Sequence, residues 1–305
     1  MLACPCVRCE RVNDVMGGVR DVSDGRQPRR VRPAAVAGTW YPRGTALLTN
    51  AVDRLVAVAD ESAGDLPGDL VALIAPHAGL TYSGTVAAHA YRLLRRRVFD
   101  VAVLVGPSHF VGFEGVAAYR SGAFETPLGL VPIDDDAAAT LMCATSVVHE
   151  HDAAHAREHS LEMQLPFLQR FAPELPILPL VMGFQTDTTV RALADGLAAT
   201  LRGRRPLLIA SSDLSHYHPA NVAARLDQLV LDLVTAFDAD GLQAALDANP
   251  EHACGGGPVV AVMRAARQLG AADARVLQYA DSGDVSGDKS SVVGYMAGAI
   301  GRFPS

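Results

Sequence analysis

The stretch LVALIAPHAG (residues 70–79) has the pattern of an apolar strand that ends at Pro76 and places His77 directly beyond its end. A short uninterrupted apolar run of this kind is typical of a strand that is buried on both faces of a sheet. Comparable runs occupy residues 101–106, 177–183, 206–211, 274–280 and 291–300. The sequence therefore predicts a central β-sheet, mostly parallel or mixed.

Amphipathic segments alternate with these runs and predict helices that flank the sheet. The predicted helices cover residues 44–60, 83–96, 134–144, 159–171, 187–202, 219–236, 238–247 and 258–269. Two glycine-centred breaks within residues 115–134 indicate a hairpin excursion. No repeat or linker interrupts the pattern after residue 31, so we expect a single α/β domain over residues 31–305.

The first 30 residues show no hydrophobic periodicity and are predicted to be a flexible extension. Cys4, Cys6 and Cys9 lie close enough in sequence to bind a soft metal ion. A structural zinc site, however, needs four ligands, and no nearby histidine completes this set. Met16 also offers a second start, so we leave the segment outside the predicted fold.

Composition narrows the classes of partner and location. The chain has 26 Lys and Arg residues against 33 acidic ones and a formal charge of -7, which argues against nucleic acid and anionic membranes as partners. No apolar run is long enough to span a membrane, and the first 30 residues lack the apolar segment of a secretory signal. Five cysteines are an odd count that does not suit a disulfide framework, so we expect a cytoplasmic protein.

Polar side chains follow three of the predicted strands. His77 follows the first, His109 follows residues 101–106, and Asp213 and His216 follow residues 206–211. Each histidine alone is explained equally well by a buried ring bonded to a loop carbonyl. Because the carboxyl ends of parallel strands meet at one edge of a sheet, their coincidence favours a shared site.

A cysteine joins this set from the segment HACGGGPVV (residues 252–260). Pro258 suits the first turn of a helix, so Cys254 lies just before a helix N-terminus, a position that favours a thiolate. Three glycines beside it leave the backbone open to a ligand or an anion. The alternative interpretation is a structural cysteine beside a turn that needs glycine for its backbone angles.

Two chemistries are compatible with these residues. His77, His109 and Cys254 form a plausible metal triad with open positions for substrate, suited to iron first and to copper or zinc as alternatives. His216 with Asp213 would then act as an acid/base beside the metal. A thiol hydrolase would instead use Cys254 as nucleophile, His216 as base and Asp213 to orient it, which leaves His77 and His109 without a role.

The segment HEHDAAHAREHSLEMQLPF (residues 149–167) is rich in histidine. His151, His155 and His159 recur every four residues and would form a metal-binding face on a continuous helix. Ser160 is a good N-cap for the apolar sequence that follows it. We therefore predict a solvated loop from which His159 and Glu162 point inward, rather than an independent metal site.

Several motifs taken together resemble the Memo family, including the bacterial protein B of the AmmeMemoRadiSam system. In order along residues 31–303 they are AGTWYP, APHAGLTYSG, GPSHF, EHSLEMQLPF, SSDLSHY, CGGGP and DKSSVVGYMAGAI. The resemblance implies a fold similar to LigB-like class III extradiol dioxygenases, in which two histidines and a carboxylate hold Fe(II) and another histidine is the acid/base. It assigns His77 and His109 to the histidine ligand positions and His216 to the acid/base position, with Cys254 in place of the carboxylate.

This replacement bears on the expected function. A thiolate donates more electron density than a carboxylate and is itself oxidisable, so the resemblance does not carry ring cleavage over to this chain. Trp40, Tyr82 and Asp213 also match positions around the Memo pocket. We expect a metal-dependent oxidoreductase or, alternatively, a non-enzymatic protein that binds a peptide or small anion in the same pocket. The resemblance further implies AMMECR-type and radical SAM proteins as partners.

Overall fold

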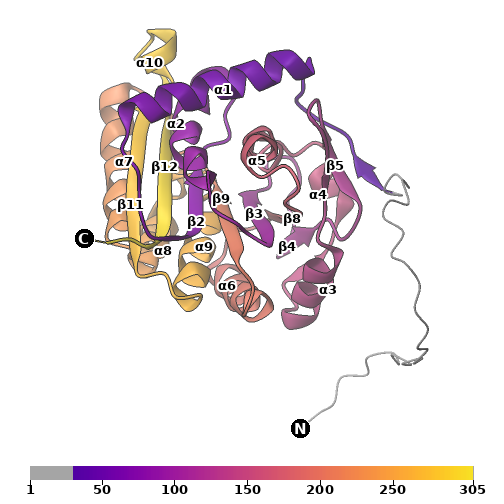
Figure 1. Cartoon of the computed structure of the whole chain (residues 1–305). Coiled ribbons are helices and arrows are strands. Elements are labelled where there is room, and N and C mark those ends of the chain that lie inside the picture. Colours follow the sequence, from indigo (N-terminus) through magenta and orange to yellow (C-terminus); the bar gives the residue numbers. More distant parts are fainter. Residues whose placement is uncertain (1–29, 305) are drawn as a thin grey trace, which may run out of the picture.

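The computed structural model describes residues 30–304, and the predicted flexible extension with its three cysteines lies outside them. A mixed nine-stranded sheet runs through the domain in the order β10-β12-β2-β9-β3-β8-β4-β7, with β11 paired to β12 (Figure 1). Its strands are β2 (Asp69–Ala75), β3 (Val101–Pro107), β4 (Val116–Ala118), β7 (Val148–Glu150), β8 (Ile177–Met182), β9 (Pro206–Ser211), β10 (His216–His218), β11 (Asp273–Asp281) and β12 (Val292–Arg302). The prediction of a central mixed sheet is confirmed.

Four neighbouring strands at the centre, β2, β9, β3 and β8, run parallel. Ala75 pairs with Ser211, and Val105 pairs with Ala210, so β2, β9 and β3 end at nearly the same level. The chain segments that follow them therefore leave the sheet side by side. Strands β12 and β4 run antiparallel to their neighbours β2 and β8 and flank this parallel centre.

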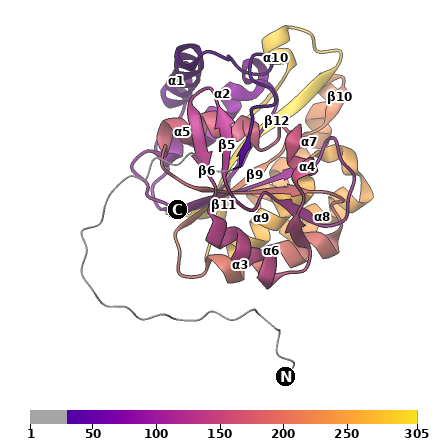
Figure 2. The same ribbon diagram turned by 90° about the vertical axis from the view of Figure 1, so that its right-hand side faces the viewer.

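Helices cover both faces of the sheet, as Figures 1 and 2 show. They are α1 (Thr45–Ser62), α2 (Leu80–Tyr91), α3 (Asp135–Ala144), α4 (Asp152–Ala156), α5 (Leu165–Phe171), α6 (Asp187–Leu201), α7 (Ala220–Thr235), α8 (Ala239–Ala248), α9 (Gly256–Gln268) and α10 (Gly283–Ser286). Side chains alternate along each strand, so Val103 packs toward α3, α6 and α9 while Leu104 packs toward α1, α2 and α5. Within residues 30–304 no helix combines the length and apolar character needed to cross a membrane.

The predicted hairpin excursion is also present. Strands β5 (Ala123–Thr126) and β6 (Gly129–Pro132) pair antiparallel, and β1 (Val31–Arg32) adds to β5 as the third strand of a small sheet. This small sheet brings the start of the described chain beside the segment that contains α4 and α5 (Figure 1). Arg32 is buried there, and its guanidinium donates to the carboxylate of Glu162.

The prediction for residues 149–167 is wrong in two respects. The segment is not a solvated loop, because it contains β7 and α4 and buries His155, Glu158 and Ser160. Ser160 is not an N-cap either: its hydroxyl donates to the carbonyl of Pro107, and α5 begins only at Leu165 after a 3₁₀ turn. The Ser160 hydroxyl makes a tertiary hydrogen bond instead of the local bond to the helix that its sequence position favoured.

Candidate metal centre

Three predicted side chains converge at the edge where the parallel strands end. His77 follows β2, His109 follows β3, and Cys254 lies just before α9. One nitrogen of each histidine and the Cys254 sulfur all lie within 4.8 Å of one another, and Sγ of Cys254 is 3.3 Å from Nε2 of His77. Ligands about 2.0–2.3 Å from a shared ion lie roughly 3.3–3.8 Å apart in a tetrahedral site, so small side-chain adjustments would complete the centre.

Hydrogen bonds fix which nitrogen His77 offers. The Ser211 hydroxyl donates to the carbonyl of Ser160 at 2.6 Å, so it acts as acceptor for the Nδ1–H of His77 at 2.9 Å. This bond leaves the lone pair of Nε2 facing Cys254. Burial, reinforced by the nearby His109, lowers the pKa of His77 well below its ordinary value and keeps the ring neutral, as a metal ligand must be.

Glu158, which the sequence analysis did not single out, does the same for His109. Its carboxylate accepts the Nδ1–H of His109 at 2.9 Å and the backbone N–H groups of His109, His159 and Ser160. Although burial opposes ionisation, these bonds hold the pKa of Glu158 at about 2. A carboxylate on the far nitrogen is the usual support of a metal-binding histidine, and it leaves Nε2 of His109 free.

The turn that carries Cys254 fits only without side chains at its glycines. A Cβ on Gly255 would lie 2.3 Å from the carbonyl oxygen of Ser211, and one on Gly256 would lie 2.5 Å from Leu246. The turn therefore packs directly against the end of β9. The glycine pattern has a steric reason in this structure, and the same packing brings Cys254 to the strand edge.

The thiol itself does not have the property that its position before a helix suggested. Burial, followed by the nearby Asp213 carboxyl, raises the pKa of Cys254 well above its ordinary value. The predicted preference for a thiolate at the helix start is therefore wrong for the protein without a metal, because desolvation outweighs the helix terminus. A bound cation would reverse this balance, since coordination deprotonates a thiol outright.

The arrangement of Asp213 and His216 does not assemble the thiol hydrolase triad. The Asp213 carboxylate accepts the backbone N–H of His77 at 2.7 Å, and burial raises its pKa to about 7 despite that bond. No hydrogen bond in the described chain joins Asp213 to His216 or His216 to Cys254. His216 lies partly buried at the start of β10. Burial lowers the pKa of His216, and the nearby His109 lowers it further.

An aromatic stack lies beside the centre. The His159 ring is stacked on His109 with centroids 4.4 Å apart, and Trp40 contacts the His159 ring at 4.2 Å. Burial, followed by the nearby His109, lowers the pKa of His159 to about 4. Atoms of His109, Glu158 and His159 also approach one another closely enough to hold an ion, but Glu158 already accepts four hydrogen bonds. We therefore regard this second cluster as support for the first.

Trp40 and Tyr82 border an open pocket of about 520 Å³ beside this stack. Both side chains are partly exposed, at 36% and 45%, so each presents part of its aromatic ring to a ligand in the pocket. Tyr217, which has a positive φ of 63°, also lines this pocket and is 77% exposed. Strained and exposed residues of this kind are typical of functional surfaces.

Glu162, which we predicted to point inward, is buried but does not line the pocket that Trp40 and Tyr82 border. Its carboxylate is fully buried and accepts hydrogen bonds from Arg32, the Ala35 and Val36 N–H groups and the Tyr41 hydroxyl. These contacts hold the segment that leads to Trp40. Glu162 thus acts on the pocket only through the backbone it anchors.

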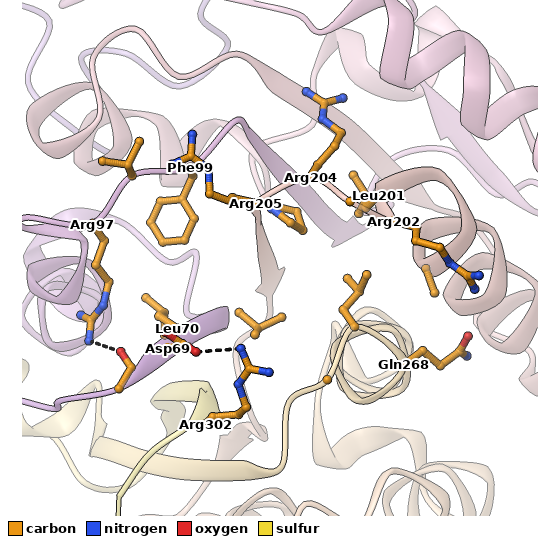
Figure 3. Close-up of a pocket in the computed structure, with 18 residues that line it drawn as sticks. Asp69, Leu70, Arg97, Phe99, Leu201, Arg202, Arg204, Arg205, Gln268 and Arg302 are labelled. Carbon is orange, nitrogen blue, oxygen red and sulfur yellow. Dashed lines mark hydrogen bonds and ion pairs between the residues drawn. The ribbon is translucent and has the colours of Figure 1, made fainter.

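A second large pocket lies at the opposite end of the parallel strands, where β2 and β9 begin (Figure 3). Five arginines, Arg97, Arg202, Arg204, Arg205 and Arg302, line its volume of about 640 Å³. Four of them donate to carboxylates or backbone carbonyls nearby, as Arg302 does to Asp69. Their charges are therefore largely used within the protein, and the pocket lies far from the histidines.

The fold and the site together define an α/β protein with two imidazoles and a thiol at the carboxyl edge of a mixed sheet. The donor set fits a metal ion. Both rings present Nε2, and within the described part of the chain no cationic side chain acts on the Cys254 thiol to compensate a thiolate charge. The profile of the family described as "Memo-like protein" matches residues 32–299. The chain therefore belongs to the Memo-like family.

Relatives and a solved structure agree with this assignment. A MEMO1 family protein of Methanothermobacter thermautotrophicus is 38% identical over 273 residues, which cover 87% of this chain and 98% of the relative. One from Ignicoccus hospitalis is 39% identical over 278 residues, covering 88% and 97%. The crystal structure of an uncharacterised Escherichia coli K12 protein covers 76% of this chain and all of its own with a TM-score of 0.51 and 18% identity, which supports the fold alone.

Proposed function

We propose that the protein holds a redox-active metal ion, iron first and copper second, through His77, His109 and Cys254, and acts as a metal-dependent oxidoreductase. The observation that carries the proposal is the convergence of three donor atoms from separate chain segments within 4.8 Å. Imidazole and thiolate donors suit iron, copper and zinc, and disfavour magnesium and calcium. Three protein ligands leave open positions, which is the arrangement of catalytic rather than structural metal sites.

The protein's own residues around the ion would supply binding, orientation and proton transfer. Ser211 and Glu158 hold the two ligand rings, and the pocket walled by Trp40 and Tyr82 would receive the substrate. The metal would supply redox chemistry when bound. Asp213, with a pKa of about 7 before any metal binds, is suited to exchange a proton near neutral pH.

Metal analysis of protein purified without oxygen tests the proposal. We expect about one equivalent of iron or copper per wild-type protein. The bound metal should fall at least tenfold in the His77→Ala/His109→Ala double variant and in Cys254→Ser. Circular dichroism melting of each variant checks that it is folded. Full metal occupancy in the folded double variant would contradict the proposed ligands.

A peptide-binding function is a second candidate, favoured by the aromatic pocket itself. Among residues 30–304, those that line it include Trp40, Tyr82 and Tyr217 and one carboxylate, Asp288, but no arginine or lysine. That lining suits an apolar or cationic peptide segment better than a small anion. Trp40 is the single tryptophan of the chain, so its fluorescence reports binding directly. Equal peptide affinity in metal-free and metal-loaded protein would favour this candidate over the oxidoreductase.

A further inference from the structure

Gln185 makes two hydrogen bonds that bracket the turn carrying Cys254. It lies between β8 and α6, at the wall of a pocket of about 680 Å³ that Cys254 also lines. Its amide nitrogen donates to the carbonyl of Cys254 at 2.7 Å, and its amide oxygen accepts the N–H of Gly257 at 2.7 Å. One planar side chain thus joins the first and last residues of the turn that spans residues 254–257.

These bonds satisfy groups that the start of α9 leaves open. The first backbone N–H groups of a helix have no partner within the helix, and a side chain at the N-cap usually accepts one of them. Here the N-cap is Gly255, which has no side chain. Instead, the amide oxygen of Gln185, from another part of the chain, accepts the N–H of Gly257 in the first turn of α9.

The opposite side of the turn is held by the end of β9. The N–H of Cys254 donates to the carbonyl of Asp213 at 3.3 Å, and the N–H of Gly255 donates to the Ser212 hydroxyl at 3.0 Å. Together with Gln185 these contacts fix the peptide planes on both sides of the Cys254 Cα. The direction of its Cα–Cβ bond, and therefore the position of the sulfur, follows from them.

Gln185 packs closely against the turn at Gly257, which has no side chain to obstruct it. A Cβ on Gly257 would lie 2.8 Å from Cβ of Gln185, closer than unbonded carbons approach. Glycine at this position therefore gives Gln185 its place. Only a side chain that both donates and accepts can make the two bonds, which a glutamate or a methionine of similar length cannot.

We propose that Gln185 is a positioning residue that sets the Cys254 thiol against His77 and so gives the metal centre its third ligand. The inference rests on the proposed metal-binding function. It extends that function to a residue in the loop between β8 and α6. His77 is held separately by Ser211, so loss of Gln185 should displace the sulfur and leave the imidazole in place.

The test uses Co²⁺ as probe, because a cobalt–thiolate bond gives a charge-transfer absorption band that cobalt–imidazole bonds lack. In the full-length protein, Gln185→Glu keeps the bond from Gly257 and turns the contact with the Cys254 carbonyl into a repulsion, while Gln185→Met removes both bonds. We expect each variant to bind Co²⁺ about 10- to 100-fold more weakly, as is typical when the support of a ligand is lost. The thiolate band at saturation should also weaken.

Gln268→Glu is the matched control, because this glutamine at the other end of α9 bonds Asp195 across helices and is remote from the centre. Melting curves separate folding from positioning: a merely structural role would lower the melting temperature and leave the band at saturation unchanged. Wild-type affinity and band in both Gln185 variants would overturn the inference. Wild-type Co²⁺ binding by Cys254→Ser would instead overturn the proposed centre itself, so the two failures are distinguishable.

Discussion

His77 and His109 present the same ring nitrogen to the centre because different partners hold their other nitrogen. A neutral serine hydroxyl holds His77, whereas the ionised carboxylate of Glu158 holds His109. A carboxylate makes a stronger hydrogen bond than a hydroxyl and raises the basicity of the ring it orients. The two proposed ligands are therefore not equivalent, and His109, the more exposed of the two, depends on the stronger partner.

Replacing Glu158 by Gln should consequently weaken the centre. The amide keeps the shape and one acceptor oxygen, but it removes the charge that orients and polarises His109. We expect the affinity for Zn²⁺ or Co²⁺, measured by competition with a chelator, to fall about 10- to 100-fold.

The exposed Glu174 provides the control, because Glu174→Gln makes the same chemical change away from the centre. An unchanged affinity in folded Glu158→Gln would show that the bond to His109 contributes nothing to metal binding.

The sequence predicted that His77 and His109 would lie together but not which residues orient them, and the reason is physical. His77 and His109 each follow an apolar strand, and strand ends lie at a shared edge. Glu158 lies 49 residues from His109 along the chain, in a segment rich in charge where a carboxylate next to histidines gives no local signal. The raised pKa of the Cys254 thiol was equally out of reach, because it depends on how deeply the turn packs.

Among the secondary-structure elements, the bounds of the parallel strands and of most helices were predictable within a few residues. Hydrophobic periodicity and apolar runs depend only on residues that are neighbours in the sequence, so they can be read without the fold. Strand β9 has its predicted bounds, and β2 begins one residue earlier than predicted. The short strands β7 and β10 and the helix α4 were missed, since tertiary packing rather than sequence period maintains them. The same limit explains the wrong assignment of Ser160 as a helix cap.

The contacts that anchor residues 32–41 to the 3₁₀ turn before α5 lead to a prediction about stability. Glu162 is fully buried and is the shared partner of Arg32, Tyr41 and two backbone N–H groups. Glu162→Ala would leave the Arg32 charge buried without its partner. We expect a loss of about 3–5 kcal/mol in the free energy of unfolding, measured with urea.

The same variant should also release Trp40 from His159, because the anchored segment carries the indole. A red shift of the Trp40 fluorescence in the folded variant would report this. If Glu162→Ala lowered the free energy of unfolding no more than Glu174→Ala on the surface, the hydrogen bonds of Glu162 would not contribute to stability.

At the scale of the whole molecule, the buried histidines tie stability to pH. Burial lowers the pKa of His77, His155, His159 and His216 in the folded protein, whereas the unfolded chain titrates each near 6.5. As the pH falls below about 6.5, these histidines bind protons in the unfolded state but not in the folded state. The free energy of unfolding therefore decreases. Asp213 acts in the opposite sense: its raised pKa contributes stability at low pH that is lost as the pH rises from about 4 to about 7.

His155 isolates the first effect, because it is 1% exposed and lies apart from the three ligands. Its Nε2 lies 3.1 Å from the carbonyl of Ala117, and its Nδ1 has no partner within the described chain. Burial lowers its pKa to about 3. This single ring should therefore remove about 3 kcal/mol of stability between pH 7 and pH 4.

His155→Gln keeps a donor for the Ala117 carbonyl but cannot titrate. Urea unfolding of wild type and variant across this range should therefore converge as the pH falls, with the variant losing about 3 kcal/mol less. Because Asp213 and the other histidines remain in both proteins, the difference between the two curves belongs to His155. Parallel curves for wild type and His155→Gln would mean that the folded protein accommodates the His155 proton, and the burial argument would fail.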